Sequence, residues 1–148
     1  MQLFGLPIKF KKMKKTLVLF AVIILVILKP IHSQLVIYTY KCMHGVWDKY
    51  KQKYTYSDPK ELDFVFKVYK SHITVNDKAG SVYKMTKQSN DVIENEYTIK
   101  GFDCVDEKNR SCNVSIIKYN DPEIPNVITV IYESVAFMYF IKYSENLD

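Results

Sequence analysis

Glycine and histidine are scarce in this chain, and each scarcity removes a class of function. Four glycines in 148 residues are too few to build a glycine-rich loop around a phosphate group. Of the three histidines, only His44 and His72 lie beyond residue 33, whereas a zinc site needs three or four ligands at a recognisable spacing. The Gly-x-Ser-x-Gly pattern of serine hydrolases is also missing. We therefore expect no enzyme, no metal and no cofactor.

Acidic residues are missing from residues 1–33, which contain six lysines. Five of these lysines precede an apolar run of thirteen residues, Thr16 to Leu28, and Lys29-Pro30 ends the run. A positive segment, an apolar run of about 7–15 residues and a small residue at the cut define a secretory signal peptide. The segment resembles bacterial signal peptides. We expect cleavage after Ser33, so that residues 34–148 are extracytoplasmic, either secreted or periplasmic.

An uncleaved membrane anchor is the alternative for residues 1–33. A helix of the thirteen apolar residues would be about 20 Å long, short of the hydrocarbon core of about 30 Å. In this alternative the chain crosses the membrane once, with residues 34–148 outside because the lysines stay inside. The membrane would then be contacted only through this segment. Met13-Lys14-Lys15 is similar to the start of such peptides, so Met1 and Met13 both stay open as the first residue.

The positive charge of the whole chain belongs to this N-terminal segment. The formal net charge is +5, but residues 34–148 contain 15 basic and 16 acidic residues. A nearly neutral domain has no electrostatic basis for binding nucleic acid or an anionic surface. We expect neither partner.

Residues 34–148 have the size of one domain and the pattern of an all-β fold. Apolar residues alternate with polar ones from Leu62 to Tyr69, and turn signals such as Ser57-Asp58-Pro59 and Asn76 to Gly80 recur along the chain. The expected strands cover residues 62–69, 72–76, 82–86, 93–103, 112–119, 127–132 and 135–143, with a turn at residues 43–45. Residues 35–40 fit a strand or a continuation of the leader, and residues 47–56 fit either a helix or a strand, with their neighbours favouring the strand. This spacing predicts an antiparallel sandwich or barrel of about seven or eight strands. Because every connection is short, we favour a meander barrel or half-barrel, preceded by the N-terminal hydrophobic helix.

Three cysteines, Cys42, Cys104 and Cys112, follow the N-terminal segment. In an oxidising compartment two of them are expected to pair. If Cys104 faces Cys112 across a hairpin, apolar and aromatic residues also face each other, as sheets favour. The matched pairs are Phe102 with Val114, Ile99 with Ile117, and Tyr97 with Tyr119. We therefore predict a Cys104–Cys112 disulfide, and we expect Cys42 to be a buried small hydrophobe.

Gly45-Val46-Trp47 resembles the Gly-x-Trp that opens the first strand of lipocalins. This resemblance implies an eight-stranded up-and-down barrel that holds a small apolar ligand. The region after Ser33 also resembles small exported bacterial β-proteins to which no activity is assigned. The shared features are the signal peptide, the early Trp47, the Asp103-Cys104 hairpin and the aromatic last strand.

Trp47, Tyr50, Tyr54 and Tyr56 form the candidate binding surface, because large aromatic residues dominate contact energies. The other interpretation is that a tyrosine-rich β-domain simply exposes some of its twelve tyrosines. We expect a non-catalytic binding or interaction domain, whose partner is a protein or a small apolar ligand. An extracytoplasmic enzyme would instead need polar groups that converge in a cleft.

Overall fold

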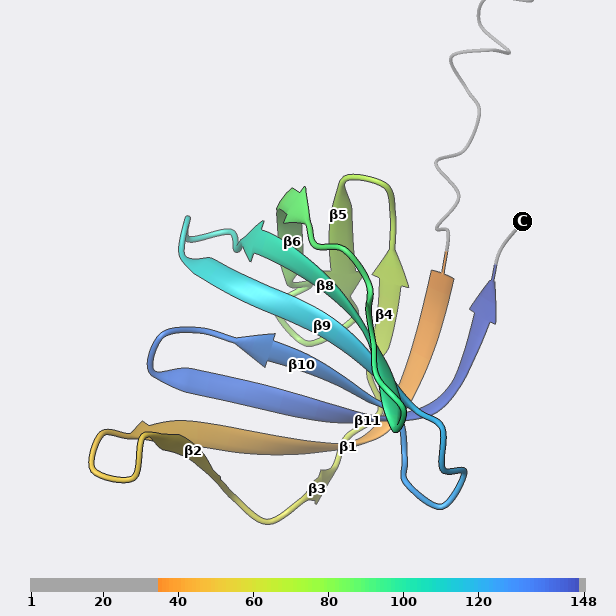
Figure 1. The fold of residues 1–148 in the computed structure, drawn as a ribbon. Helices are drawn as coiled ribbons and strands as arrows, with labels where there is room; N and C mark the ends of the chain where they lie inside the picture. Colours follow the sequence, from red (N-terminus) through yellow and green to blue (C-terminus); the bar gives the residue numbers. More distant parts are fainter. Residues whose placement is uncertain (1–34, 147–148) are drawn as a thin grey trace, which may run out of the picture. The chain divides into compact units, whose positions relative to one another are not determined.

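The computed structural model describes residues 35–146, which form a closed antiparallel β-barrel (Figure 1). Each of its eight strands pairs with the next, and the last strand pairs with the first. The barrel strands are β1 (Leu35–Asp48), β4 (Val65–Val68), β5 (His72–Val75), β6 (Val82–Gln88), β8 (Tyr97–Val105), β9 (Ser111–Tyr119), β10 (Val127–Ile131) and β11 (Val135–Asn146). The all-β antiparallel prediction is confirmed, and the architecture is a barrel rather than a sandwich.

Three short strands lie outside the main circuit. They are β2 (Lys53–Tyr56) and β3 (Lys60–Glu61), which pair with β1, and β7 (Val92–Ile93), which pairs with β8. None of the described residues belongs to a helix that is long and apolar enough to cross a membrane. The predicted signal peptide and hydrophobic helix lie outside the described residues and stay predictions.

The register of the β8–β9 hairpin is the one that the side-chain pattern predicts. Cys104 lies opposite Cys112, and the three expected apolar and aromatic pairs, Phe102 with Val114, Ile99 with Ile117 and Tyr97 with Tyr119, also face each other. The predicted last hairpin is confirmed as well, because β10 pairs with β11 from Val127 opposite Phe140 to Ile131 opposite Ala136. The side-chain pattern therefore predicted the register of the β8–β9 hairpin, and the position of the turn predicted the β10–β11 hairpin.

The predicted disulfide is not formed, although its two cysteines face each other. Cys42, Cys104 and Cys112, all within the described residues, are free thiols. The Cys104 thiol donates a hydrogen bond to the main-chain oxygen of Phe102, with 3.6 Å between the sulfur and the oxygen. The side chain of Cys104 is thus turned along its own strand, and a directly opposed register alone does not join the two sulfurs.

Strand β1 is longer than the sequence predicts and closes the barrel. It pairs with β11 from Leu35 opposite Asn146 to Val46 opposite Val135, with an irregularity near Thr39. The predicted turn at residues 43–45 is therefore wrong. Gly45 is buried in the strand under the ring of Tyr56, whose Cε1 would be 2.8 Å from an added Cβ. An aromatic ring that covers a strand glycine compensates for the side chain that glycine lacks.

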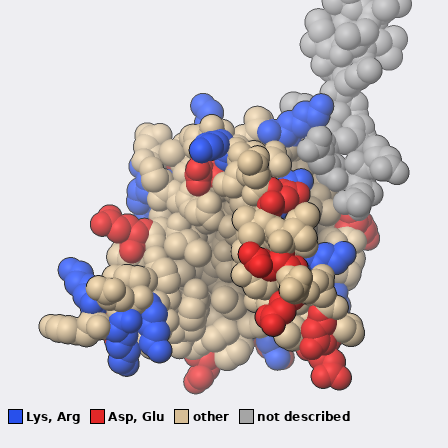
Figure 2. Space-filling model, viewed as in Figure 1, with Lys and Arg blue, Asp and Glu red and all other residues tan. Residues whose placement is uncertain are grey.

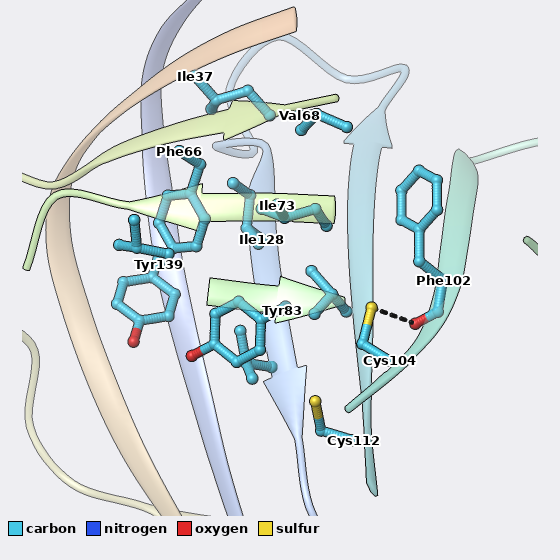
Figure 3. Close-up of a cluster of buried hydrophobic side chains, with 13 residues drawn as sticks. Ile37, Phe66, Val68, Ile73, Tyr83, Phe102, Cys104, Cys112, Ile128 and Tyr139 are labelled. Atoms are coloured by element: carbon cyan, nitrogen blue, oxygen red, sulfur yellow. Dashed lines mark hydrogen bonds between the residues drawn. The ribbon is translucent and has the colours of Figure 1, made fainter. Parts of the chain in front are cut away.

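Apolar side chains fill the barrel between β1, β4, β5, β9 and β10 (Figure 3). The largest apolar side chains that are at most 1% exposed are Ile37, Phe66, Ile73, Val114, Ile128 and Val130. Burying one such side chain contributes about 1.5–3 kcal/mol. We call these six residues the apolar plug. They belong to one apolar cluster that also includes Tyr83 and Tyr139.

Candidate functional site

A cavity of about 490 Å³ opens at one end of the barrel. The β5–β6 and β8–β9 loops and the β10–β11 turn contribute to its lining. Its apolar wall includes Leu62, Phe64, Val82, Val135 and Phe137. Figure 2 shows a hollow on the visible face that is free of charged side chains, with acidic side chains beside it. An apolar wall with charged groups at its rim makes the site suitable for the body of a small organic molecule.

Two buried tyrosines lie where the apolar plug ends. Tyr83 from β6 and Tyr139 from β11 are 8% and 9% exposed, and both line the cavity. Figure 3 shows their hydroxyl groups on the same side of the cluster. The Tyr139 ring packs edge-on against Phe66, with 4.9 Å between the ring centroids. Phe66 therefore supports the floor of the cavity from below.

Burial also sets the protonation of these phenols. Removal from water raises the pKa of Tyr83 to about 12, and burial likewise raises the pKa of Tyr139. Both hydroxyls therefore stay protonated at neutral pH. They present a hydrogen-bond donor and an acceptor to the cavity, and they cannot act as bases there.

An ion pair braces the β8–β9 loop at the rim of the cavity. The Arg110 side chain donates to Asp106 Oδ2 from Nε, at 2.8 Å, and Nη2 lies 2.7 Å from the same oxygen. The main-chain nitrogens of Lys108 and Arg110 each donate to Asp106 Oδ1 at 2.9 Å. The guanidinium of Arg110 also lies over the Tyr132 ring, 4.9 Å from its centroid. The charge of Asp106 is thus matched within the loop.

We predict that Asp106→Asn lowers the free energy of unfolding by about 1–2 kcal/mol at pH 7. Burial alone would raise the pKa of Asp106, but the hydrogen bonds and charge of Arg110 outweigh it and lower the pKa to about 2. A lowered carboxyl pKa stabilises the folded state above the unfolded pKa, near 3.8, and this contribution is lost as the pH falls towards 2. Urea unfolding from pH 7 to pH 2 should therefore show the variant's deficit shrinking below pH 4. A deficit that is constant with pH would contradict this assignment.

A second carboxylate, Asp77, braces the β5–β6 loop. Its Oδ1 accepts hydrogen bonds from the main-chain nitrogens of Ala79, at 3.1 Å, and Ser81, at 2.9 Å. Its Oδ2 accepts one from Ser81 Oγ at 2.5 Å. Burial opposes ionisation, yet the donors of Ser81, Gly80 and Ala79 outweigh it and lower the pKa of Asp77. Asp77 is therefore ionised at neutral pH at the wall of the cavity.

The thiols near the cavity are not activated nucleophiles. Cys42, which the sequence predicts to be buried, is half-buried and lines the cavity wall. Burial raises the pKa of Cys42, and it raises the pKa of Cys104 to about 12 and that of Cys112 to about 11. The thiolate is the reactive form, and these side chains are protonated at neutral pH. Within residues 35–146, no group of three or more His, Cys, Asp or Glu could hold a metal ion.

Three of the four residues of the predicted aromatic surface pack against one another in the structure. Trp47, Tyr54 and Tyr56 form a row across β1 and β2, with ring centroids 5.1 Å and then 6.3 Å apart. The Tyr54 hydroxyl donates to the main-chain oxygen of Tyr132 at 2.5 Å. Tyr50 lies in the β1–β2 turn and is fully exposed, whereas Trp47 is 36% exposed. We call Trp47, Tyr54 and Tyr56 the aromatic row.

Sequence reasoning missed the cavity and its polar rim. Asp106 and Arg110 stand four residues apart in a hairpin loop, and this spacing was the one local signal that they could brace it. The cavity itself is lined by residues from β1 to β11 that no short motif connects.

A comparison of the chain with protein-family models, curated proteins and solved structures finds no match.

Proposed function

We propose that residues 34–148 form an exported, non-catalytic binding domain that holds a small, largely apolar molecule in the barrel cavity. The observation that carries the proposal is the cavity of about 490 Å³, open at the end of the barrel beyond the apolar plug. Ligand pockets have volumes of about 300–1,000 Å³ and mostly apolar walls. Export rests on the signal-peptide pattern of residues 1–33.

The protonation states around the cavity favour binding over catalysis. A general acid or base works best with a pKa near the operating pH. The phenol of Tyr83 and the thiol of Cys112 have raised pKa values, and the carboxyls of Asp77 and Asp106 have lowered ones. Each of these groups therefore keeps one protonation state at neutral pH, which suits a fixed recognition surface.

The eight-stranded meander is the architecture that the lipocalin resemblance implies. Many unrelated barrels share this architecture. In addition, Gly45 and Trp47 lie near the end of β1, whereas the lipocalin Gly-x-Trp opens the first strand. We therefore base the proposal on the cavity rather than on that resemblance.

Blocking the cavity tests the proposal. Val135 lies on the cavity side of β11, whereas Met138 belongs to the opposite face of the same strand. We expect Val135→Trp to weaken binding of the uncharged fluorescent dye Nile red by about ten-fold or more, because the indole fills the space. Met138→Trp is the matched control and should leave dye affinity unchanged. Equal affinities in wild type and Val135→Trp, measured by fluorescence titration, would contradict the proposal.

A protein partner on the aromatic row is the second candidate. Trp47 is 36% exposed. Tryptophan and tyrosine are enriched in interfaces and their hot spots. If Nile red binding is lost in Trp47→Ala but retained in Val135→Trp, the dye binds at the aromatic row and not in the cavity, which favours this second candidate.

A further inference from the structure

We infer that the cavity selects a small organic cation with an aromatic or apolar body over neutral and anionic molecules of the same shape. The inference rests on the proposed function, since it concerns the ligand of the same cavity. It follows from the charges at the wall, the aromatic rings that line the cavity and the two buried hydroxyls.

The cavity wall carries one negative charge that no side chain neutralises. Within residues 35–146 the ion pairs are Lys51 with Asp48 and Arg110 with Asp106. Asp106 is therefore matched by Arg110, whereas Asp77 is held by uncharged donors from its own loop. Glu107 and Lys108 also reach the rim, but they are exposed, of opposite sign, and screened by water. A cation in the cavity would meet the uncompensated charge of Asp77.

The cavity that Asp77 lines is also rich in aromatic rings. Phe64, Tyr83, Tyr132, Phe137 and Tyr139 all line the cavity. The face of an aromatic ring attracts a cation, most strongly where water is excluded. Tyr132 already accepts the guanidinium of Arg110 at 4.9 Å. The other four rings offer the same type of contact to a bound cation.

The buried hydroxyls complete the site. Tyr83 and Tyr139 are more than nine-tenths buried, line the cavity, and carry their hydroxyls on the same side (Figure 3). Their oxygens can accept hydrogen bonds from an ammonium group. Burial is the main cause of the raised pKa of Tyr83, with smaller contributions from Cys112 and from the carboxylates of Asp77 and Asp106, so a negative charge is disfavoured at this position. An anionic ligand would meet the same penalty.

Three probes that share a naphthalene body test the inference on the full-length protein. They are (2-naphthylmethyl)trimethylammonium, 2-naphthalenemethanol and 2-naphthoate, titrated by calorimetry at pH 7. We expect the cation to bind about ten-fold more tightly than the alcohol, with the anion weakest. An alcohol that binds as tightly as the cation, or more tightly, would overturn the inference but leave binding in the cavity intact. If no probe binds, or if binding survives Val135→Trp, the proposed function fails as well.

Two variants distinguish the contribution of the Asp77 charge to cation binding from the contribution of the aromatic rings. Asp77→Asn should weaken binding of the cation about three- to ten-fold and leave the alcohol unchanged. The matched control is Asp121→Asn, because Asp121 lies in the β9–β10 loop and accepts a similar main-chain hydrogen bond, from Glu123 at 2.9 Å. Phe137→Leu keeps the apolar wall but removes a ring, so it should weaken the cation more than the alcohol. Equal losses for both probes in Asp77→Asn and Phe137→Leu would overturn the inference.

Discussion

Replacing Phe66 with alanine is expected to lower the free energy of unfolding by about 3–5 kcal/mol. Phe66 is 1% exposed and lies between Ile37 of β1 and Val75 of β5, its register partners. Its ring also packs edge-on against Tyr139 at 4.9 Å. Alanine would leave a hole among strands that are held in register, so the surrounding side chains could refill it only in part.

The same substitution should also weaken binding, because Tyr139 forms the floor of the cavity on top of Phe66. Phe66→Leu keeps most of the apolar volume and should cost much less, below about 1.5 kcal/mol. Phe140→Ala is a second control, since Phe140 is only half-buried and belongs to the other face of β11. Urea unfolding followed by circular dichroism measures all three. A loss below about 1 kcal/mol for Phe66→Ala would show that the apolar plug is not packed as described.

Replacing Gly45 with valine is expected to destabilise the barrel by about 1–3 kcal/mol. Valine favours strands, so propensity alone would predict a gain. The loss arises because an added Cβ would be 2.8 Å from Cε1 of Tyr56, directly across the β1–β2 pair. The ring must then move away, which disturbs the aromatic row between Tyr54 and Trp47.

A double-mutant cycle isolates this steric cause. Tyr56→Ala removes the ring, so Gly45→Val should cost little in the Tyr56→Ala background. The two substitutions should therefore be non-additive, with a coupling of about 0.5–3 kcal/mol. Trp47 fluorescence should change in Gly45→Val, because Trp47 packs edge-on against Tyr54 at 5.1 Å. Additive free energies of unfolding would mean that Tyr56 does not cover Gly45 in solution.

The two hairpins were predictable because each consists of two strand-forming segments that are adjacent in the sequence and joined by a short turn. For β8 and β9, a register that places Cys104 opposite Cys112 also matches the apolar and aromatic residues of the two strands. The disulfide was not predictable, because it depends on side-chain rotation: the Cys104 thiol is bonded to the main chain of Phe102 instead. The register determines which residues of two strands lie opposite each other, but not the side-chain rotamer that positions each sulfur.

The full length of β1 and the cavity could not be predicted from the sequence for a different reason. Gly45 indicates a turn when it is considered alone, and only the ring of Tyr56, eleven residues later, makes it a strand residue. Likewise, Tyr83 and Tyr139 meet across the barrel from β6 and β11. Such contacts depend on closure of the whole sheet, which local periodicity does not encode.

The most direct test of the account is an NMR titration of the full-length protein with (2-naphthylmethyl)trimethylammonium. The account predicts that amide shifts change around the cavity, at Val82, Val135 and Phe137, while amides of the β9–β10 loop stay unchanged. Shift changes confined to the aromatic row, or spread over the β9–β10 loop instead, would contradict the claim that the open end of this barrel is its binding site.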